Sequence, residues 1–513
     1  MSKERERIMK HTKNIAAALL AVLAASSVMT ACGGSGDTGA GVVTDAVTGG
    51  ADSTVETSAD TAELTDLQIR QSIPDNLPEV DYGGREFRIA CSEEYNFHNE
   101  FWVEEQNGDQ CNDAVYQRNE KIESRFNTKI SIVSQGATDR EATPKFLNKI
   151  AMAGDDAAEL CAYVNYMAYI PIGQRSCLDW TEVPNVDLTQ PWHNKHANDG
   201  ATVNGKLFAI CSDLSISSMT YTYAIFFNTR LTSNYDMEPD YLYDLVRSGD
   251  WTIDKFIGLT KDLYVDTNGN GSKDETDTFG FGYMICNTGD VWLTAFNQPL
   301  TVVKDDGSLE ITFMSEKTES ALTKMRDYQE NSLGFCEYEQ LYSEETYFAG
   351  GTVAFAPLRF SAAFTALRDM EDNYSILPYP KWDTAQEIYF TNADDKFQVF
   401  SIPTTAPDPE YIGTIFEAMS AESYRSVYPT YYDVALKGKY SSDPTPAEMF
   451  DLIMSGRKFE FSFQFGKDHF LRMPYLFRDL LLTPSLKIAS KWATVEKHVN
   501  KTRDKFYALF EDQ

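Results

Sequence analysis

The feature that most constrains the fold is a regular alternation of strand-like and helix-like stretches early in the chain. In order, these are a strand over 86–90, a helix over 114–126, a strand over 129–133, a helix over 144–153 and a strand over 160–164. Asn112 and Asp113 stand where they can cap the first helix. Consecutive strand–helix–strand units place parallel strands in one sheet through right-handed crossovers. The sequence therefore predicts an α/β fold whose first sheet is largely parallel.

Polar residues follow two of these strands. Ser92 to Tyr95 come after the first strand, and Asn165 and Tyr166 come after the third. Ligands on parallel sheets bind outside the carboxyl ends of the strands. We therefore predict a binding site at this edge, with Glu93, Glu94 and Tyr95 among its contacts.

The N-terminus has the residue order of a secretory leader. Five basic residues precede a run of small and apolar residues over 15–28, which is too short to span a bilayer permanently. The run ends in Met29-Thr30-Ala31-Cys32, which resembles a bacterial lipobox with Met where Leu is usual. We expect residues 1–31 to be a lipoprotein signal peptide, and acyl chains on Cys32 to anchor the protein on the extracellular face of the cell membrane. The alternative is a plain secretory leader cut elsewhere, with Cys32 left as a thiol.

Composition separates a tether from a folded part. Residues 32–78 are mostly Gly, Ser, Thr, Ala, Asp and Glu, which cannot bury a core, so we predict a flexible tether there. Residues 79–513 are numerous and apolar enough to fold into two lobes. The formal net charge is −32, and the five basic and two acidic residues of the leader contribute +3, which leaves −35 on the mature chain. This charge repels nucleic acids and anionic lipid surfaces, so we expect neither as a partner.

The eight cysteines form no recognisable metal or redox motif. No Cys-x-x-Cys occurs in the sequence, which argues against a thiolate metal site or a thioredoxin-like role. If Cys32 is lipidated, an odd number of cysteines remains, so they cannot all pair within the chain. We predict no disulfide and expect most thiols to be buried.

A turn and a strand in the middle of the chain carry a family resemblance. The turn is Asn204-Gly205-Lys206-Leu207-Phe208-Ala209, and the strand that follows ends in Phe227-Asn228. The segments 113–119, 153–156 and 348–360 support the resemblance. The chain resembles the extracellular solute-binding proteins of ABC importers, in particular family 1, which takes up oligosaccharides. This resemblance implies a periplasmic-binding-protein-like fold of two lobes with crossover hinge strands, a ligand cleft between the lobes and closure by a hinge motion.

The resemblance also implies where the lobes begin and end. Lobe 1 would comprise about 83–210 and 381–428, and lobe 2 about 214–377 and 430–513. The chain would cross between the lobes near 211–214, near 377–381 and near residue 429.

An oxygen-rich loop over 266–277 has the spacing of an EF-hand. Oxygen-bearing side chains stand at its first, third, fifth, ninth and twelfth positions, and Gly271 stands at the sixth. The last position is Asp277, where a glutamate usually closes the loop, so we expect weaker binding of Ca²⁺. The ion would brace the corner between a helix and a strand, and the alternative is an Asn-Gly turn without metal. The predicted metal ligands are Asp266, Asn268, Asn270, Ser272, Asp274 and Asp277.

Sugars present apolar faces and rings of hydroxyl groups, which require aromatic rings and charged or amide side chains in a binding site. The predicted ligand contacts are Glu93, Glu94, Tyr95, Trp192, Asp213, Trp292, Arg359 and Phe360. For each aromatic residue the alternative is packing in the core. Arg359 has the further alternative of an ion pair between the lobes.

These features predict the monomeric receptor of an ABC importer. It would capture a solute, an oligosaccharide in particular, and deliver it to the permease without making or breaking a bond, although amino acids and peptides remain open as solutes. One alternative is a secreted polysaccharide-degrading enzyme with paired carboxylates. Another is a cell-surface adhesin, which would have no enclosed cleft.

Overall fold

The computed structural model describes residues 65–136, 139–304, 308–338, 343–432, 445–465 and 473–510. The predicted signal peptide, the lipidation of Cys32 and most of the predicted tether therefore lie outside the described residues. The side chain of Tyr95 also lies outside them, although its backbone is described.

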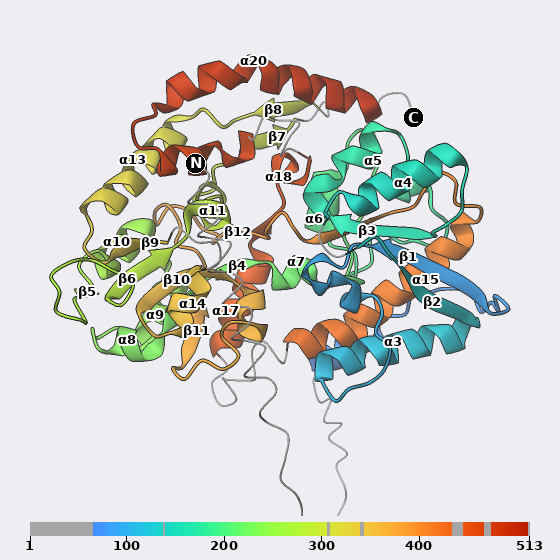
Figure 1. Cartoon of the computed structure of the whole chain (residues 1–513), viewed down its shortest axis with the longest axis horizontal. Coiled ribbons are helices and arrows are strands. Elements are labelled where there is room, and N and C mark those ends of the chain that lie inside the picture. The colour runs from blue at the N-terminus through green and yellow to red at the C-terminus, as the bar shows by residue number, and fades with distance from the viewer. Residues whose placement is uncertain are drawn as a thin grey trace, which may run out of the picture. The chain divides into compact units, whose positions relative to one another are not determined.

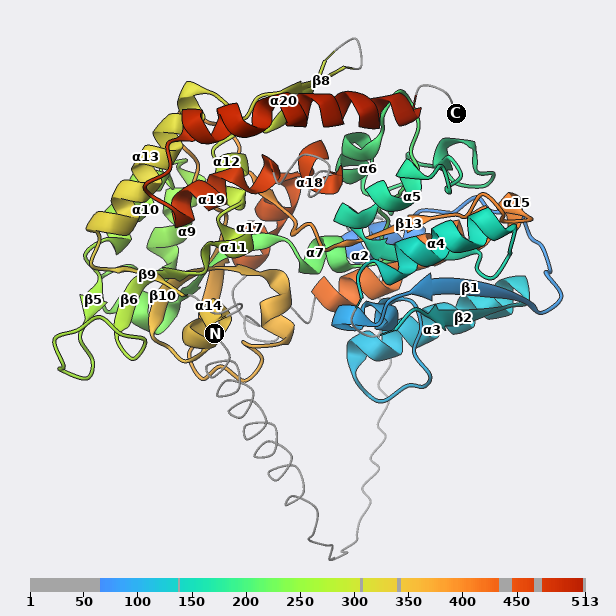
Figure 2. The same ribbon diagram turned by 45° about the horizontal axis from the view of Figure 1, so that its top comes forward.

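The first sheet has four strands in the order β13-β3-β1-β2. Figure 1 labels β1, β2 and β3, and Figure 2 labels β13. β1 is parallel to both of its neighbours, and β13 runs antiparallel to β3. The strands are β1 (Arg85–Cys91), β2 (Thr128–Ser134), β3 (Leu160–Val164) and β13 (Gln398–Ser401). The helices packed on this sheet are α3 (Gln110–Phe126), α4 (Ala142–Ala153) and α15 (Pro409–Glu422). This order confirms the largely parallel first sheet that the sequence predicts.

Helix α3 begins earlier than the sequence predicts. Asp109 is its N-cap, and the Asp109 carboxylate accepts the backbone N–H groups of Cys111 and Asn112, both at 3.0 Å. Asp113 lies inside the helix and accepts the N–H groups of Asn107 and Gly108 from the preceding loop. The prediction of a cap at Asn112–Asp113 was wrong because the helix already begins at Gln110, so that Asn112 and Asp113 lie within its first turn and Asp109 caps it.

The second sheet is mixed, in the order β11-β4-β10-β6-β5, and β9 also pairs with β6. β10 runs parallel to β6 and antiparallel to β4. Its strands are β4 (Tyr223–Asn228), β5 (Tyr264–Val265), β6 (Thr278–Tyr283), β9 (Phe335–Glu337), β10 (Val353–Arg359) and β11 (Tyr374–Leu377). Its surrounding helices include α9 (Pro239–Arg247), α10 (Ile253–Thr260), α13 (Glu316–Asn331) and α14 (Ser343–Ala349). We call the parts built on the first and second sheets lobe 1 and lobe 2.

The chain passes between the lobes three times, and all described residues belong to one compact unit. The first passage precedes β4 and contains α7 (Ser217–Thr220), and the second joins β11 to β13. The third leaves α15 through the π-helical turn η5 (Ser423–Val427) and leads towards α17 (Thr445–Ser455). β12 (Thr391–Asn392) of the second passage pairs with β14 (Arg457–Lys458), which follows α17 in the chain.

The C-terminal part touches both lobes. α18 (Phe461–Phe465) packs on η2 (Asn165–Met167) and α6 (Lys195–Ala201) of lobe 1, and α19 (Leu476–Leu482) packs on α13 of lobe 2. α20 (Ile488–Tyr507) then runs along one edge of the two lobes (Figures 1 and 2). Trp492 near its start packs on Phe313 of lobe 2, and Phe510 beyond its end packs on Phe208 of lobe 1, with ring centroids 5.5 and 5.3 Å apart. No described helix is both long enough and apolar enough to cross a membrane.

Short elements complete the described chain. They are α2 (Asp66–Ser72), η1 (Glu94–Glu100), α5 (Tyr169–Gly173), η3 (Trp180–Glu182), α8 (Thr229–Ser233), α11 (Ile285–Thr288), α12 (Val291–Ala295), β7 (Thr301–Val303), β8 (Leu309–Ile311), η4 (Phe360–Phe364), η6 (Met473–Tyr475) and η7 (Ala508–Phe510).

Helix α2 lies within the stretch for which the sequence predicts a tether. Thr65 and Gln68 form a reciprocal capping box at its start. The residues after it are held by two arginines, because Arg425 donates to the carbonyl of Ile73 at 2.6 Å and Arg125 pairs with Asp75 at 2.7 Å. These contacts fix the start of the folded part to the turn η5 of the third passage.

Candidate functional site

Charged residues of both lobes meet at the second passage. The backbone N–H of Asp394 donates to the carbonyl of Tyr221 in the first passage, at 2.8 Å, and the carbonyl of Asp395 accepts the N–H of Tyr166 after β3, at 3.3 Å. Arg359 at the end of β10 reaches Asp394 at 3.6 Å. We call the set Tyr221, Tyr223, Arg359, Asp394, Asp395, Lys396 and Tyr475 the interlobe cluster.

Asp394 is the centre of this cluster. Its side chain is buried, accepts the hydroxyl of Tyr223 at 2.8 Å and pairs with the ammonium of Lys396 at 3.2 Å. Burial opposes ionisation, but Lys396 and Arg359 outweigh it and lower the pKa of Asp394. Asp394 is therefore an ionised carboxylate in a buried place.

Asp395 behaves in the opposite way. Its carboxylate accepts the hydroxyl of Tyr475, which precedes α19. Burial and the neighbouring Asp394 raise the pKa of Asp395 to about 6, although Lys396 counteracts them. The surroundings thus shift the pKa values of two adjacent carboxyl groups in opposite directions.

The guanidinium of Arg359 joins several parts of lobe 2 to the passages. It lies 4.8 Å above the ring centroid of Tyr221, which is a cation–π geometry, and 3.2 Å from Glu345 of α14. Tyr221 is only partly buried and also packs against Phe97 of lobe 1, at 5.3 Å between ring centroids. Tyr221 therefore links an aromatic surface of lobe 1 to the charge of Arg359.

A second polar group from lobe 1 adjoins the cluster. Arg140 donates to Glu94 at 2.8 Å and to the hydroxyl of Tyr166 at 3.0 Å. The side chains of Arg140 and Glu94 are 35% and 17% exposed, so both can reach a solute while they stay paired. Partly exposed aromatic and charged groups thus stand beside a buried ionic centre.

The structure brings only some of the predicted contacts to this place. Glu94 and Arg359 take part, whereas the Glu93 carboxylate accepts the hydroxyl of Ser134 at the end of β2. Phe360 is buried and stacks on Phe450 of α17 at 4.7 Å between ring centroids.

The remaining three predicted contacts lie elsewhere. Trp192 is fully buried and donates its indole N–H to Glu417 at 3.0 Å. Trp292 is fully buried against Tyr379 in lobe 2, with ring centroids 5.1 Å apart. Asp213 lies in the first passage, where burial raises its pKa to about 7 against the opposing effect of Arg70 and Arg457.

Sequence reasoning missed most of the charged partners. Tyr166 follows a predicted strand and was expected near the site, but Arg140, Tyr221, Asp394, Asp395 and Lys396 stand in loops without a motif. The run Asp394-Asp395-Lys396 just before β13 is the one signal that could have indicated them, because three charges at the start of a buried strand need partners.

The predicted calcium loop is a compact turn held by its own oxygens. Asp266 accepts the N–H groups of Gly269 and Gly271 at 2.7 and 2.8 Å, and Gly271 has a φ of +75°. Asp277 is fully buried and accepts the hydroxyl of Tyr264 at 2.8 Å.

Two side-chain amides of this loop are hydrogen-bonded to the carboxylate of Asp274. Asn268 and Asn270 donate to Asp274 at 2.9 and 2.6 Å. Hard oxygen donors on a tight glycine turn suit Ca²⁺, and an ion bound there would replace these two amide–carboxylate bonds with contacts to the amide oxygens. Among the described residues, no three His, Cys, Asp or Glu side chains gather into a metal site.

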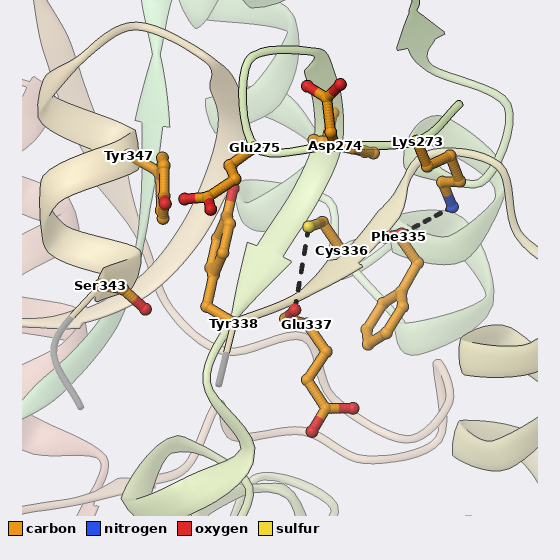
Figure 3. A pocket seen from close by; sticks show the side chains of 10 residues that line it. Lys273, Asp274, Glu275, Phe335, Cys336, Glu337, Tyr338, Ser343 and Tyr347 are labelled. Carbon is orange, nitrogen blue, oxygen red and sulfur yellow. Dashed lines mark hydrogen bonds between the residues drawn. The ribbon is translucent and has the colours of Figure 1, made fainter. Parts of the chain in front are cut away.

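A separate hollow of about 470 Å³ lies beside this loop (Figure 3). The rings of Tyr338 and Tyr347 stack at 4.3 Å between centroids, and Lys273 across the hollow donates to the carbonyl of Phe335 at 3.0 Å. Cys336 in its wall is partly exposed, and the other five cysteines with described free thiols are buried. The hollow belongs to lobe 2 alone and is distinct from the interlobe cluster.

Comparison with known proteins shows the fold. No protein-family model matches the chain, and no curated protein sequence matches it. An ABC substrate-binding protein from Listeria monocytogenes in complex with cycloalternan has a TM-score of 0.51 and 14% identity, over 84% of this chain and 100% of that one. The maltose/maltodextrin-binding domain MalE from Bdellovibrio bacteriovorus bound to maltotriose has a TM-score of 0.51 and 13% identity, over 82% of this chain and 99% of that one.

A third similar structure is an ABC transporter solute-binding protein from Thermotoga lettingae bound with α-D-tagatose. It has a TM-score of 0.50 and 13% identity, over 83% of this chain and 100% of that one. All three are named as binding proteins or as a binding domain, and none is named as an enzyme. The predicted fold class is confirmed: the chain has the two-lobed α/β fold of ABC-transporter solute-binding proteins.

Proposed function

We propose that this protein is the receptor of an ABC importer, which binds a sugar between its two lobes and delivers it to a permease chemically unchanged. The observation that supports this most is the two-lobed fold shared with proteins whose structures hold tagatose, maltotriose and cycloalternan. An oligosaccharide is the proposed solute, because two of these three ligands are oligosaccharides.

The interlobe cluster and the adjoining pair of Arg140 and Glu94 offer the groups that a sugar requires. Tyr221 supplies a partly exposed ring for an apolar sugar face, and Glu94 and Arg140 supply an acceptor and donors for hydroxyl groups. These side chains come from lobe 1 and from the first passage, and Arg359 of lobe 2 contacts Tyr221. A solute at this place would contact lobe 1 and the first passage, next to Arg359 of lobe 2, and we expect its binding to favour closure of the lobes about the three passages.

No chemical step belongs to this proposal. Asp394 is occupied by Tyr223, Lys396 and Arg359, and Asp395 is occupied by Tyr475. Because these carboxylates are already paired, they are better placed to support a binding surface than to act as the acid and base that cleave a glycosidic bond.

We further propose that acyl chains on Cys32 hold the receptor on the extracellular face of the cell membrane. The lipobox-like Met29-Thr30-Ala31-Cys32 after a secretory leader supports this. Incorporation of radiolabelled palmitate into the wild-type chain, and its loss in Cys32→Ser, would test the anchor.

We also propose that the loop over 266–277 binds Ca²⁺. The supporting facts are the EF-hand spacing of Asp266, Asn268, Asn270, Ser272, Asp274 and Asp277 and the left-handed φ of Gly271 at the sixth position. The ion would join α10 and β5 to β6 at a corner of lobe 2 and would take no part in solute binding.

A thermal-shift screen tests the proposed function. The panel holds monosaccharides including tagatose, linear and cyclic oligosaccharides, amino acids and short peptides. We expect an oligosaccharide to raise the Tm, to bind at one molecule per chain in titration calorimetry, and to be recovered intact by mass spectrometry. A shift by peptides alone would contradict the proposed solute class, and conversion of the bound sugar would contradict the receptor.

A further inference from the structure

The helix α20 carries a charge opposite to that of the rest of the protein. The segment 487–510 holds five lysines, one arginine and two acidic residues, a formal net charge of +4 in a chain whose total is −32. An exposed basic helix on a strongly acidic protein is a charge asymmetry of the kind that directs association.

The basic residues of α20 form a stripe along one flank. Lys487, Lys491, His498, Lys501 and Lys505 are spaced by multiples of three and four residues that keep them on one side of the helix. Lys491 is partly buried and the other four are exposed. At 1.5 Å per residue the stripe is about 27 Å long.

Among the described residues, no ion pair involves Lys487, Lys491, Lys501 or Lys505. The body-facing side of the helix is instead apolar, with Val499 and Phe506 buried.

Helix α20 is also connected to both lobes. Trp492 rests on Phe313 of lobe 2, whereas Phe506 packs on Phe461 and Phe465 of α18, which lies against lobe 1. A partner bound along the outer face of α20 is thus supported by both lobes.

We propose that the basic stripe of α20 docks an acidic segment of a partner protein. A second copy of this chain fits poorly, because two strongly acidic bodies repel each other. An anionic bilayer meets the same repulsion, and the exposed Glu496 and Asp504 lie close to the stripe, in one hollow with Lys501 and Lys505. A narrow carboxylate-rich loop can contact the stripe without approaching the acidic body.

An open hollow beside the stripe is lined by side chains of both signs of charge. It measures about 760 Å³ and is lined by Glu496, Lys497, Asn500, Lys501, Asp504, Lys505 and Ala508. Alternating carboxylates and ammonium groups favour a protein surface over a uniform polyphosphate. The inference rests on the proposed function in one respect. A receptor must deliver its solute to another protein, and this requirement is the reason to expect a partner.

The test uses a fluorescein-labelled peptide of sixteen residues rich in Glu and Asp as the probe, with the full mature chain. Fluorescence anisotropy compares the wild type with Lys491→Glu/Lys501→Glu/Lys505→Glu at low and at physiological ionic strength. The matched control is Lys149→Glu/Lys195→Glu/Lys261→Glu, which makes the same charge change at exposed lysines elsewhere. A Lys→Gln version of the stripe variant, checked by circular dichroism, separates lost contacts from charge reversal.

We expect one peptide per chain, about tenfold weaker binding to both stripe variants, unchanged binding to the control, and weakening by salt. Equal binding to the stripe and control variants would overturn the proposal. Stripe-dependent binding to phosphatidylglycerol vesicles without peptide binding, or stripe-dependent dimers in sedimentation, would also overturn it. Solute binding is measured without the peptide, so failure here and failure of the receptor proposal are distinguishable.

Discussion

The interlobe cluster and the loop over 266–277 both concentrate carboxylates, but they obtain their partners differently. In the interlobe cluster, Tyr223 and Asp394 are 171 residues apart in sequence and meet only when the lobes assemble. In the loop, Asn268 and Asp274 are six residues apart, and most partners are backbone N–H groups of the same turn. The first arrangement is a product of tertiary structure and the second of local sequence.

This difference predicts unequal consequences of substitution. Removal of the Asp394 carboxylate takes a nearby negative charge away from the buried Lys396 and Arg359, which is costly in a place from which water is excluded. Removal of an oxygen from the loop leaves groups that water can reach, because the loop is largely exposed. The predictions below test this contrast, beginning with the largest expected effect.

Asp394→Asn should break the interlobe cluster. The amide cannot balance Lys396 and Arg359, so we expect a loss of about 3–5 kcal/mol in the free energy of unfolding, measured by urea denaturation. Asp383→Asn, at an exposed position of the second passage, is the control and should change it by less than about 0.5 kcal/mol. Similar stabilities of the two variants would show that the cluster is not an ionic centre.

Asp395→Asn should change the dependence of stability on pH. The pKa of Asp395 is raised to about 6 in the folded state, so its contribution is fully present below its ordinary value near 3.8 and is lost as the pH rises through about 6. Relative to the wild type, the variant should gain about 2–3 kcal/mol between pH 4 and pH 7 in denaturation experiments. The groups that face Asp395 are Asp394, Lys396 and Tyr475. Parallel pH profiles of the two proteins would contradict the assigned shift.

Chelation should affect the loop alone. If Ca²⁺ is present at ten times its Kd, its removal by EDTA lowers the free energy of unfolding by about 1.4 kcal/mol and lowers the Tm accordingly. Asp266→Ala should abolish this response, whereas Asp262→Asn, just before the loop, should keep it. If EDTA does not change the Tm of the wild type, the calcium proposal is contradicted. The interpretation of the interlobe cluster does not depend on this result.

Gly271→Ala should produce the smallest effect. Gly271 has a φ of +75°, which a β-carbon disfavours by about 1 kcal/mol, and nothing lies within 4 Å of the added atom. The matched control is Gly258→Ala in α10, which also has open space but an ordinary helical φ and should stabilise by about 0.5–1 kcal/mol. The same sign for both substitutions would contradict the left-handed turn.

The contrast also explains what the sequence could predict. The order of strands and helices in lobe 1 was predictable because hydrophobic periodicity acts over a few residues. The EF-hand-like spacing over 266–277 could be recognised for the same reason, and calcium binding there stays a prediction. The interlobe cluster was not predictable, because the partners of Asp394 come from β4, β10 and its own passage, and no local pattern places them together.

The aromatic residues also show that local sequence does not predict which side chains form the site. Trp192 and Trp292 were predicted to face a ligand, and both are fully buried in the structure, whereas the partly exposed Tyr221 was not singled out. Residue type alone cannot distinguish a ring that packs in a core from a ring that covers a sugar, because the distinction depends on which face the folded lobes leave open.

Solute binding at the interlobe cluster is tested most directly by titration calorimetry. The sugar with the largest thermal shift is titrated into the wild type and into Tyr221→Ala, after both are shown to be folded. The account predicts one sugar per wild-type chain, recovery of the sugar intact, and binding at least about tenfold weaker in Tyr221→Ala, since the variant loses the ring between Phe97 and Arg359. Equal affinity of the two proteins, or breakdown of the sugar during the titration, would contradict it.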